Sequence, residues 1–257
     1  MEKTRIEWCD SSWNPISGCY HPCPYCYARA TANRFKGCDI AESGEADTFV
    51  VDLKERLKVT NKDGVTRNAA YPFGFTPTFH EYRLDDPKTK GFGKTIFVCS
   101  MADMFGSWVP EEWIVKIFDA CKAAPGHRYL FLTKNPQRYI DLYNAGILPD
   151  GDEFWYGTTA TTADAPVFWS ERHHTFVSVE PILGPFNSED GLKTMGDTDW
   201  FIIGAETGNR KDKVVPKREW VEGIVDYAKA AGKPVFMKDS LKPIWGDDLI
   251  TEFPWEA

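Results

Sequence analysis

Short apolar segments alternate with amphipathic ones along the chain from residue 95 onward. The apolar segments show no strict polar and apolar alternation, which is typical of strands that are covered on both faces. These predicted strands are Thr95–Ser100, Arg128–Leu132, Phe154–Thr159, Thr175–Val179, Trp200–Gly204 and Pro234–Met237. A further strand is predicted near Trp13–Ser17.

Segments with apolar residues at helical spacing separate these strands. Pro110 opens a helix in which Ile114, Ile117, Phe118 and Cys121 recur at i, i+3, i+4 and i+7. The other predicted helices are Ala28–Phe35, Asn135 to about Gly146, a short one around Pro166–Arg172, and Lys217–Ala231.

Strands that alternate with helices in this way predict βαβ units and a parallel sheet. Six or seven such units indicate an α/β fold built as a barrel or partial barrel, one domain over residues 1–257, with a doubly wound open sheet as the alternative. Residues 37–94 do not follow the pattern and predict an insertion after the first helix. Either architecture places the active site at the carboxyl ends of the strands.

Composition and charge narrow the classes of function. The net charge of −8 over 257 residues does not suit a protein that coats nucleic acid through charge alone, although a local basic patch could still grip such a substrate. The chain has no apolar run of about 18 residues, and its N-terminus lacks the apolar segment of a signal peptide. We therefore expect a cytoplasmic protein with no membrane span.

Three of the seven cysteines lie within eight residues of each other. Cys19, Cys23 and Cys26 have the spacing C-x3-C-x2-C, so their thiolates can converge on one metal centre. Three cysteines do not complete a structural zinc site, which takes four protein ligands. They can instead bind three irons of a [4Fe-4S] cluster and leave the fourth iron open. A zinc site completed by His21 or Cys9 is the alternative.

Other cysteines and several indoles are expected to be buried. Cys99 lies in a predicted strand and Cys121 on the apolar face of a predicted helix, where a free cysteine behaves as a small apolar side chain. Trp8, Trp13 and Trp108 are expected in the core, with stacking on a nucleic-acid base as the alternative.

Charged side chains also follow the predicted strands. Glu180, Glu206 and Lys238 each come after an apolar strand, and a carboxylate there must be exposed in a cleft or paired, because burying it alone is costly. We predict that the three converge on one catalytic site, with a structural salt-bridge network as the alternative. The basic loop Arg210–Lys213 follows on the same side and either contacts phosphate or is solvated.

The cysteine loop resembles the signature of the radical S-adenosylmethionine (SAM) superfamily, in which an aromatic residue, here Tyr25, precedes the last cysteine. The position of the loop, between a first strand and a first helix, is also that of the superfamily. The resemblance implies a TIM-like partial barrel and a [4Fe-4S] cluster whose open iron is chelated by SAM. It further implies reductive cleavage of SAM, hydrogen abstraction from a substrate, and a reducing electron donor such as flavodoxin or ferredoxin.

The wider chain resembles a narrower group, the phage- and mobile-element-associated three-cysteine-motif proteins of unassigned function. The segments that carry this resemblance are Ile6–Trp8, Trp13–Pro15, Phe97–Gly106, Phe131–Arg138, Val177–Pro185 and Ile203–Asn209. The group is distantly similar to spore photoproduct lyase, which repairs a DNA lesion. That similarity makes nucleic acid a candidate substrate.

The resemblance also assigns polar residues after the strands to SAM. Ser100 and Asp103 stand where the superfamily carries a Gly-Gly-Glu-type segment for the SAM amino group, although this sequence departs from that segment. Asp103 is the expected amino or ribose contact, with a helix-entry carboxylate as the alternative. The further candidates for SAM are Thr133, Lys134, Thr158 and Ser178. Lys134 could pair with the SAM carboxylate or a substrate phosphate, with an ordinary solvated lysine as the alternative, and Thr158 could be a routine strand residue.

We therefore expect a radical SAM enzyme that modifies or repairs a nucleotide, a nucleic acid or a related small molecule. One alternative is a radical SAM enzyme that acts on a peptide or protein, although no separate peptide-recognition domain is visible. The other alternative is a non-catalytic binding protein stabilised by zinc or by a cluster.

Overall fold

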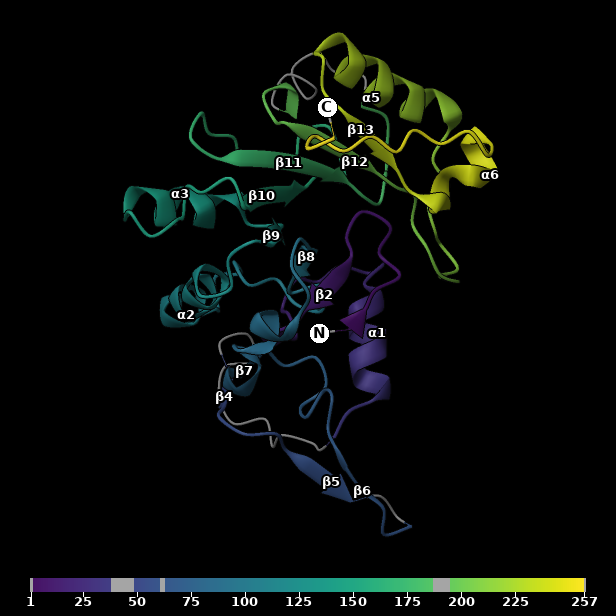
Figure 1. Ribbon diagram of the computed structural model, residues 1–257. Helices are drawn as coiled ribbons and strands as arrows, with labels where there is room; N and C mark the ends of the chain where they lie inside the picture. The colour runs from purple at the N-terminus through teal and green to yellow at the C-terminus, as the bar shows by residue number, and fades with distance from the viewer. Residues whose placement is uncertain (1, 38–48, 61–62, 187–194, 257) are drawn as a thin grey trace. The chain divides into compact units, whose positions relative to one another are not determined.

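The computed structural model describes residues 2–37, 49–60, 63–186 and 195–256 (Figure 1). They belong to two compact units, one of Met1–Thr4 and Cys9–Tyr129 and the other of Arg5–Trp8 and Leu130–Ala257. Helices and parallel strands are mixed along the chain, which confirms the predicted α/β class.

The first unit contains a sheet in which β2 is central. Its strands are β1 (Glu2–Lys3), β2 (Ser11–Trp13) and β8 (Thr95–Val98). β1 is antiparallel to β2, and β2 is parallel to β8. Helix α2 (Glu111–Lys122) follows β8 and buries the apolar face that the sequence predicts, including Cys121. Cys99 and Trp13 are buried as expected.

The strand predicted near Trp13–Ser17 is wrong as a single element. The chain forms β2, then Asn14 and Pro15, then β3 (Ile16–Ser17), which pairs with β7 (Thr78–His80) in a different sheet. Pro15 has no N–H to donate to a strand ladder, which explains the break between the two strands.

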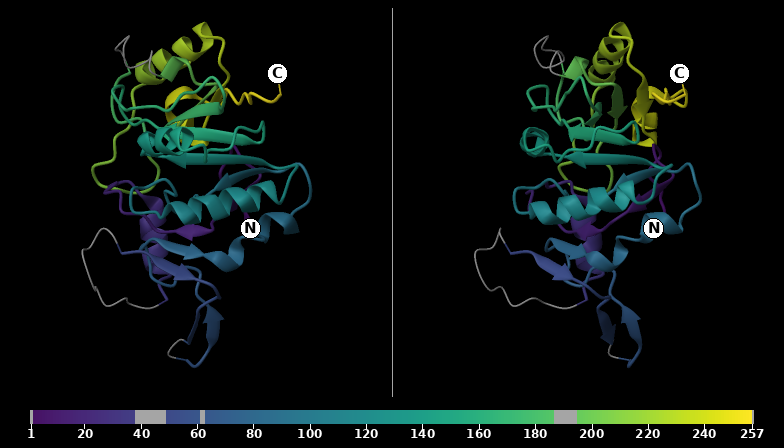
Figure 2. Two further views of the ribbon diagram at one scale, coloured as in Figure 1. Left: turned by 90° about the vertical axis from the view of Figure 1, so that its left-hand side faces the viewer. Right: turned by 60° about the vertical axis from the view of Figure 1, so that its left-hand side comes forward.

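The predicted insertion carries small sheets of its own. Its strands are β4 (Val51–Leu53), β5 (Lys58–Thr60), β6 (Thr66–Asn68) and β7. β4 pairs with β7, and β5 and β6 form an antiparallel ribbon that projects away from them (Figures 1 and 2). The 3-10 helices η1 (Glu81–Arg83) and η2 (Asp86–Thr89) lead on toward β8. Residues 38–48 and 61–62, with Cys38 among them, lie outside the described part of the chain.

The second unit is built on the strand order β9-β10-β11-β12-β13. The strands are β9 (Arg128–Thr133), whose last four residues belong to this unit, β10 (Phe154–Thr159), β11 (His174–Val179), β12 (Trp200–Ile203) and β13 (Val235–Met237). β10 to β13 are parallel to their neighbours. The helices are α3 (Pro136–Asn144), α5 (Arg218–Ala230) and α6 (Lys242–Trp245), with the 3-10 helix η3 (Asp239–Leu241) before α6.

Helix α5 packs against β12 and β13 and covers one face of this sheet (Figure 1). Successive side chains of a strand point to opposite faces, and paired residues of parallel strands share a face. Val177, Phe201 and Val235 are paired and buried in one core with Ile224 of α5. The positions one residue further along each strand, including Ser178, therefore point to the opposite face.

The short helix predicted around Pro166–Arg172 is wrong. The segment contains no helix, and the N–H of Phe168 donates to Oγ1 of Thr158 at 3.1 Å instead of to a helical carbonyl. A polar strand residue thus fixes this connection in a non-helical path. No helix in the described ranges has the length and apolar character to span a bilayer.

We expect Ile224→Ala to destabilise the second unit by about 2–5 kcal/mol, because the side chain is fully buried and its removal leaves a cavity. Urea unfolding followed by circular dichroism measures the loss. Val215→Ala is the control, since Val215 is 64% exposed and should change the unfolding free energy by less than about 0.5 kcal/mol. Equal effects of the two changes would contradict the assigned core.

Candidate functional site

The three cysteines lie on the loop between β3 and helix α1 (Tyr27–Arg34), close to the helix expected at Ala28–Phe35. Cys26 is the N-cap of α1, and its Sγ accepts a hydrogen bond from the N–H of Arg29 at 3.4 Å. The Sγ of Cys19 accepts from the N–H of His21, also at 3.4 Å. At Cys19 the N–H donor favours the thiolate, the form that binds metal, but its effect on the thiol pKa is smaller than those of burial and of Asp103.

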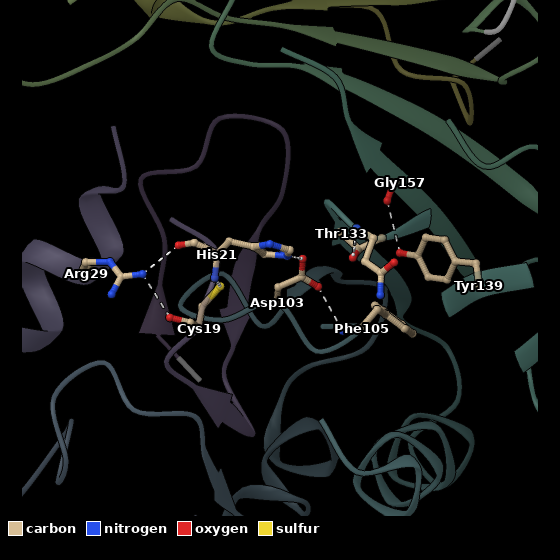
Figure 3. A network of polar contacts seen from close by, with 9 residues as sticks. Cys19, His21, Arg29, Asp103, Phe105, Thr133, Tyr139 and Gly157 are labelled. Atoms are coloured by element: carbon tan, nitrogen blue, oxygen red, sulfur yellow. Dashed lines mark hydrogen bonds and ion pairs between the residues drawn. The ribbon is translucent and has the colours of Figure 1, made fainter. Parts of the chain in front are cut away.

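Hydrogen bonds from other segments hold this loop in place. The N–H of Cys19 donates to the carbonyl of Phe75 at 3.1 Å. Arg29 donates from Nη2 to the carbonyls of Cys19 and His21 at 3.2 and 2.8 Å (Figure 3). Gly18 has a φ of +88°, and a Cβ there would lie 2.4 Å from the carbonyl oxygen of Thr76. The position therefore requires glycine.

His21 fastens the loop to the segment that follows β8. Its Nε2 lies 2.8 Å from Oδ2 of Asp103, and Oδ1 of Asp103 accepts from the N–H of Phe105 at 3.0 Å (Figure 3). Asp103 is buried, and both of its oxygens are engaged within the chain. The carboxylate predicted to contact SAM is therefore already the anchor of the cysteine loop.

Ser100 and Tyr25 are near this anchor in the chain. Ser100 donates from Oγ to Oδ1 of Asn14 at 3.2 Å, and the same oxygen of Asn14 accepts from the N–H of Met101 at 2.9 Å. Tyr25 is half-buried within the cysteine loop. Asn14, which lies between Trp13 and Pro15, was not among the residues predicted for the site.

Three thiols on one loop are soft donors of the kind that bind iron–sulfur clusters, but the environment of Cys19 favours its neutral form. Cys19 is buried, and burial together with the nearby Asp103 carboxylate raises the pKa of its thiol to about 12. A bound metal centre would supply positive charge that offsets these effects, because metal-ligating thiols are deprotonated. In the described residues no three His, Cys, Asp or Glu side chains are grouped to hold one metal ion. A [4Fe-4S] cluster does not need such a grouping around a single point.

A buried histidine, His80 of β7, contacts Ser17 of β3 and was missed in the sequence. Nε2 of His80 is 2.8 Å from Oγ of Ser17, and its Nδ1 is 3.1 Å from the hydroxyl of Tyr82. Ser17 and His80 are almost completely buried. Burial, with a smaller contribution from Arg83, lowers the pKa of His80 to about 2, so the ring is neutral. A lone histidine in an apolar strand carries no sequence signal for this role.

In the second unit, Glu180 and Lys238 come together as predicted from the strand ends. Nζ of Lys238 lies 2.5 Å from Oε1 of Glu180. The two residues follow β11 and β13, and Gly204 follows the strand between them. A Cβ on Gly204 would lie 3.0 Å from the Glu180 carboxyl carbon and 3.1 Å from Cδ of Lys238. The missing side chain at Gly204 therefore leaves the space in which the pair meets.

Glu7 adds a carboxylate that the sequence did not assign to this site. Its Oε2 accepts from the N–H of Asp239 at 3.1 Å. Burial, and to a smaller extent the charges of Asp239 and Glu180, raise the pKa of Glu7. Lys242 pairs with Asp239 at 2.8 Å. The carboxyl ends of β11 and β13 thus carry an ion-pair network with more acids than bases.

Glu206 forms its ion pair elsewhere. Its carboxylate accepts from Nε and Nη2 of Arg210 at 2.7 and 2.8 Å, and only 2% of its side chain is exposed. The hydrogen bond from Arg210 lowers the pKa of Glu206. Glu206 therefore orients the basic loop. It is Glu180, and not Glu206, that forms the ion pair with Lys238.

The remaining predicted residues lie at the ends of β9 to β11. Thr133 is buried, and its Oγ1 accepts from the N–H of Asn135 at 2.9 Å; Lys134 follows it. Thr158 pairs with Val177, so it lies on the face that α5 covers, where it holds Phe168. Ser178 is buried and points to the opposite face, the same side as Glu180 and Lys238.

A cavity of about 600 Å³ lies at the opposite, amino ends of these strands. Its lining includes the ion pairs Arg172–Asp150 and Lys233–Asp199, with Trp169 exposed nearby. The predicted site residues do not line this cavity. It is therefore separate from the strand ends that carry Glu180 and Lys238.

Fold and site define an α/β protein in which a three-cysteine loop precedes a series of parallel strands. Residues 3–247 match the family described as "Protein of unknown function (DUF5131)", and the chain belongs to that family. Neither the curated proteins nor the solved structures contain a match to the chain.

We expect the free energy of unfolding to decrease as the pH is lowered, because of His80. The pKa of His80 is lowered from 6.5 to about 2 in the folded protein, so the unfolded chain binds more protons between these values. The stabilisation is complete above the unfolded-state pKa and is lost progressively as the pH falls. Between pH 6.5 and pH 5, the titration of His80 should lower the free energy of unfolding by about 2 kcal/mol.

Urea unfolding at a series of pH values measures this dependence in the parent protein and in His80→Gln. The variant should show a shallower loss of stability toward pH 5, because glutamine does not titrate. Identical slopes for the two proteins would show that His80 is not held neutral by the fold.

Proposed function

We propose that this protein is a radical SAM enzyme in which Cys19, Cys23 and Cys26 hold a [4Fe-4S] cluster. The observation that carries the proposal is the preformed C-x3-C-x2-C loop, in which two of the three sulfurs accept backbone N–H groups. When bound, the cluster supplies an open iron for SAM and the electron for its reductive cleavage. A partial (β/α) barrel of six or seven units is part of this proposal.

The residues around the loop have defined tasks in this proposal. Arg29 holds the carbonyls of Cys19 and His21, so that the thiolates keep one arrangement. Asp103 holds His21 and so ties the loop to the chain after β8. Ser100 and Tyr25 lie close in sequence to these anchors and are the proposed contacts to SAM in the first unit.

Thr133, Lys134 and Ser178, which belong to the second unit, are candidates for SAM on the sequence alone. Thr158 belongs to that set by sequence, but its hydroxyl supports the chain at Phe168. Glu180 and Lys238 are the proposed catalytic pair, because an ammonium and a carboxylate in contact can hold or move a proton at a substrate atom. Glu206 acts through Arg210, which it orients.

The substrate in this proposal is a nucleotide, a nucleic acid or a related small molecule, and the electron donor is a flavodoxin or a ferredoxin. The basic loop Arg210–Lys213 supports a phosphate-bearing substrate, because Glu206 holds Arg210 in one orientation. Lys211 and Lys213 beside it are exposed.

Cys23→Ala should abolish cluster binding and the formation of 5′-deoxyadenosine from SAM, because only two thiolates would remain on the loop. Anaerobic reconstitution followed by iron and sulfide analysis measures the first effect, and chromatography of the SAM products measures the second. Cys121→Ala is the matched control, since Cys121 lies in the buried face of α2.

Full SAM cleavage by the Cys23 variant would refute the ligand assignment. A colourless parent protein that binds stoichiometric zinc would refute the enzyme class and favour the zinc-stabilised binding protein. Deuterium transfer from labelled nucleosides, DNA or peptides into 5′-deoxyadenosine identifies the class of substrate.

Glu180→Gln and Lys238→Met should keep the cluster but lower substrate turnover by about 10²–10⁴-fold, the usual contribution of a positioned acid or base. Iron content and product formation are measured on the same preparations. Glu222→Gln serves as the control because it breaks an exposed ion pair, with Arg218. Unchanged turnover in both site variants would remove the pair from the catalytic machinery.

A further inference from the structure

We infer that the antiparallel ribbon of β5 and β6 binds duplex DNA in the major groove. The inference rests on the proposed function, because it narrows the nucleic-acid substrate to one form and gives that substrate a contact surface. It also assigns a task to the inserted segment, which contains none of the residues predicted for the site.

The ribbon is exposed along both of its strands. β5 and β6 form a two-stranded sheet, and no third strand joins them in the described part of the chain. Figures 1 and 2 show the ribbon projecting away from β4 and β7. All three residues of β6 are exposed, as are the first and the last residue of β5. A ribbon of two strands has no core of its own, so packing does not account for the side chains that it carries.

The ribbon is basic, although the chain as a whole is acidic. Residues 54–68 contain five of the 30 lysines and arginines but only two of the 38 aspartates and glutamates. Arg56, Lys58 and Arg67 are all exposed. Cations gathered on one projecting element can attract a polyanion even though the net charge of the chain is −8.

The strand register sorts the side chains of the ribbon onto two faces. Lys58 is paired with Asn68, and Thr60 is paired with Thr66, so these four residues share one face, whereas Arg67 lies on the other. The hydroxyl oxygens of Thr60 and Thr66 are 2.8 Å apart. The first face therefore presents an ammonium, two hydroxyls and a carboxamide, and its paired residues include no carboxylate. Side chains of these types form the hydrogen bonds that read base edges in the major groove.

The root of the ribbon is held by contacts that fix its direction. Ala69, which follows β6 directly, is buried. The guanidinium of Arg56 lies over the ring of Tyr82, 5.4 Å from the ring centre. Nη2 of Arg83 donates to the carbonyl of Ala70 at 3.2 Å. Because its root is anchored, the ribbon loses less conformational freedom on binding than a free loop would.

The dimensions of the ribbon favour DNA over RNA. Paired strands lie about 4.8 Å apart, and three residues of a strand extend over about 10 Å. The major groove of B-DNA is about 12 Å wide and about 8.5 Å deep, and it admits a two-stranded ribbon. The major groove of an RNA duplex is too narrow for side chains to read. In the DNA groove, Lys58 and Arg67 contact phosphates, while the threonines and Asn68 face the base edges.

The test uses the 257-residue chain and a fluorescein-labelled DNA duplex of mixed sequence, and it measures Kd by fluorescence anisotropy over a series of salt concentrations. Combining Lys58→Ala with Arg67→Ala should raise Kd at least about tenfold and reduce the slope of log Kd against log salt by about 1.8, because each phosphate contact contributes about 0.9. Lys94→Ala combined with Lys122→Ala is the matched control, since it removes the same charge from exposed positions of the same unit. The control should change neither value. Equal losses in the two double variants, or a parent protein that does not bind the duplex, would overturn the inference.

A second variant, Asn68→Asp, guards against misfolding. It keeps the size of the side chain and adds a negative charge to the face that meets the bases, so it should also weaken binding at least about tenfold. Circular dichroism shows whether each variant keeps the parent fold. Parent affinity in Asn68→Asp would place the DNA elsewhere on the protein. An RNA duplex or a single DNA strand of the same sequence that binds as tightly as the DNA duplex would exclude the major groove.

These binding measurements do not depend on SAM cleavage, so the two proposals can fail separately. Formation of 5′-deoxyadenosine is measured on the same preparations. SAM cleavage without binding of the DNA duplex overturns this inference alone. Ribbon-dependent DNA binding without SAM cleavage refutes the proposed enzyme and supports the DNA contact.

Discussion

The cysteine loop depends on backbone groups that other segments satisfy. The N–H of Gly18 donates to the carbonyl of Met101, and the N–H of Cys19 donates to that of Phe75. The side chain of Arg29 donates to the carbonyls of Cys19 and His21. A loop with two prolines forms few hydrogen bonds of its own, so these external partners decide its shape. The spacing of the thiolates is therefore set by the packing of the first unit and not by the loop alone.

His21 and Asp103 likewise hold the cysteine loop through a contact with another segment. A histidine between two cysteines invites a role as a metal ligand, yet its Nε2 is bonded to Asp103. The contact joins the loop to the segment after β8, which also carries Trp108 and Gly106. A substitution at any of these positions is expected to act on the cysteines through their arrangement.

Much of the α/β series could be predicted because its strands are buried on both faces. Phe154–Thr159 coincides with β10, since all six residues are buried and the segment lacks charged side chains and the strict alternation of a half-exposed strand. The helix around Pro166–Arg172 could not be excluded in the same way, because the bond from Phe168 to Thr158 depends on the tertiary structure. The division of Trp13–Ser17 into two strands depends on partners that lie 85 residues away for β2 and 61 to 63 residues away for β3.

The candidate site shows the same division between local and tertiary information. Glu180 and Lys238 could be found because a charge that ends an apolar strand needs a partner. Glu7 could not, since it comes from the start of the chain and reaches Asp239 only in the folded protein. Arg210 lies four residues after Glu206, but which cation this carboxylate pairs with is decided by side-chain geometry in the folded protein.

Gly204 has a consequence for how this family can vary. The glycine bears no reactive group, yet the two charged residues beside it need the volume that its side chain would fill. The Cβ of an alanine at this position would lie 3.0 Å from the Glu180 carboxyl carbon and 3.1 Å from Cδ of Lys238, so both side chains would have to shift by a few tenths of an ångström. Among relatives, we therefore expect residue 204 to change only together with the charged residues on either side.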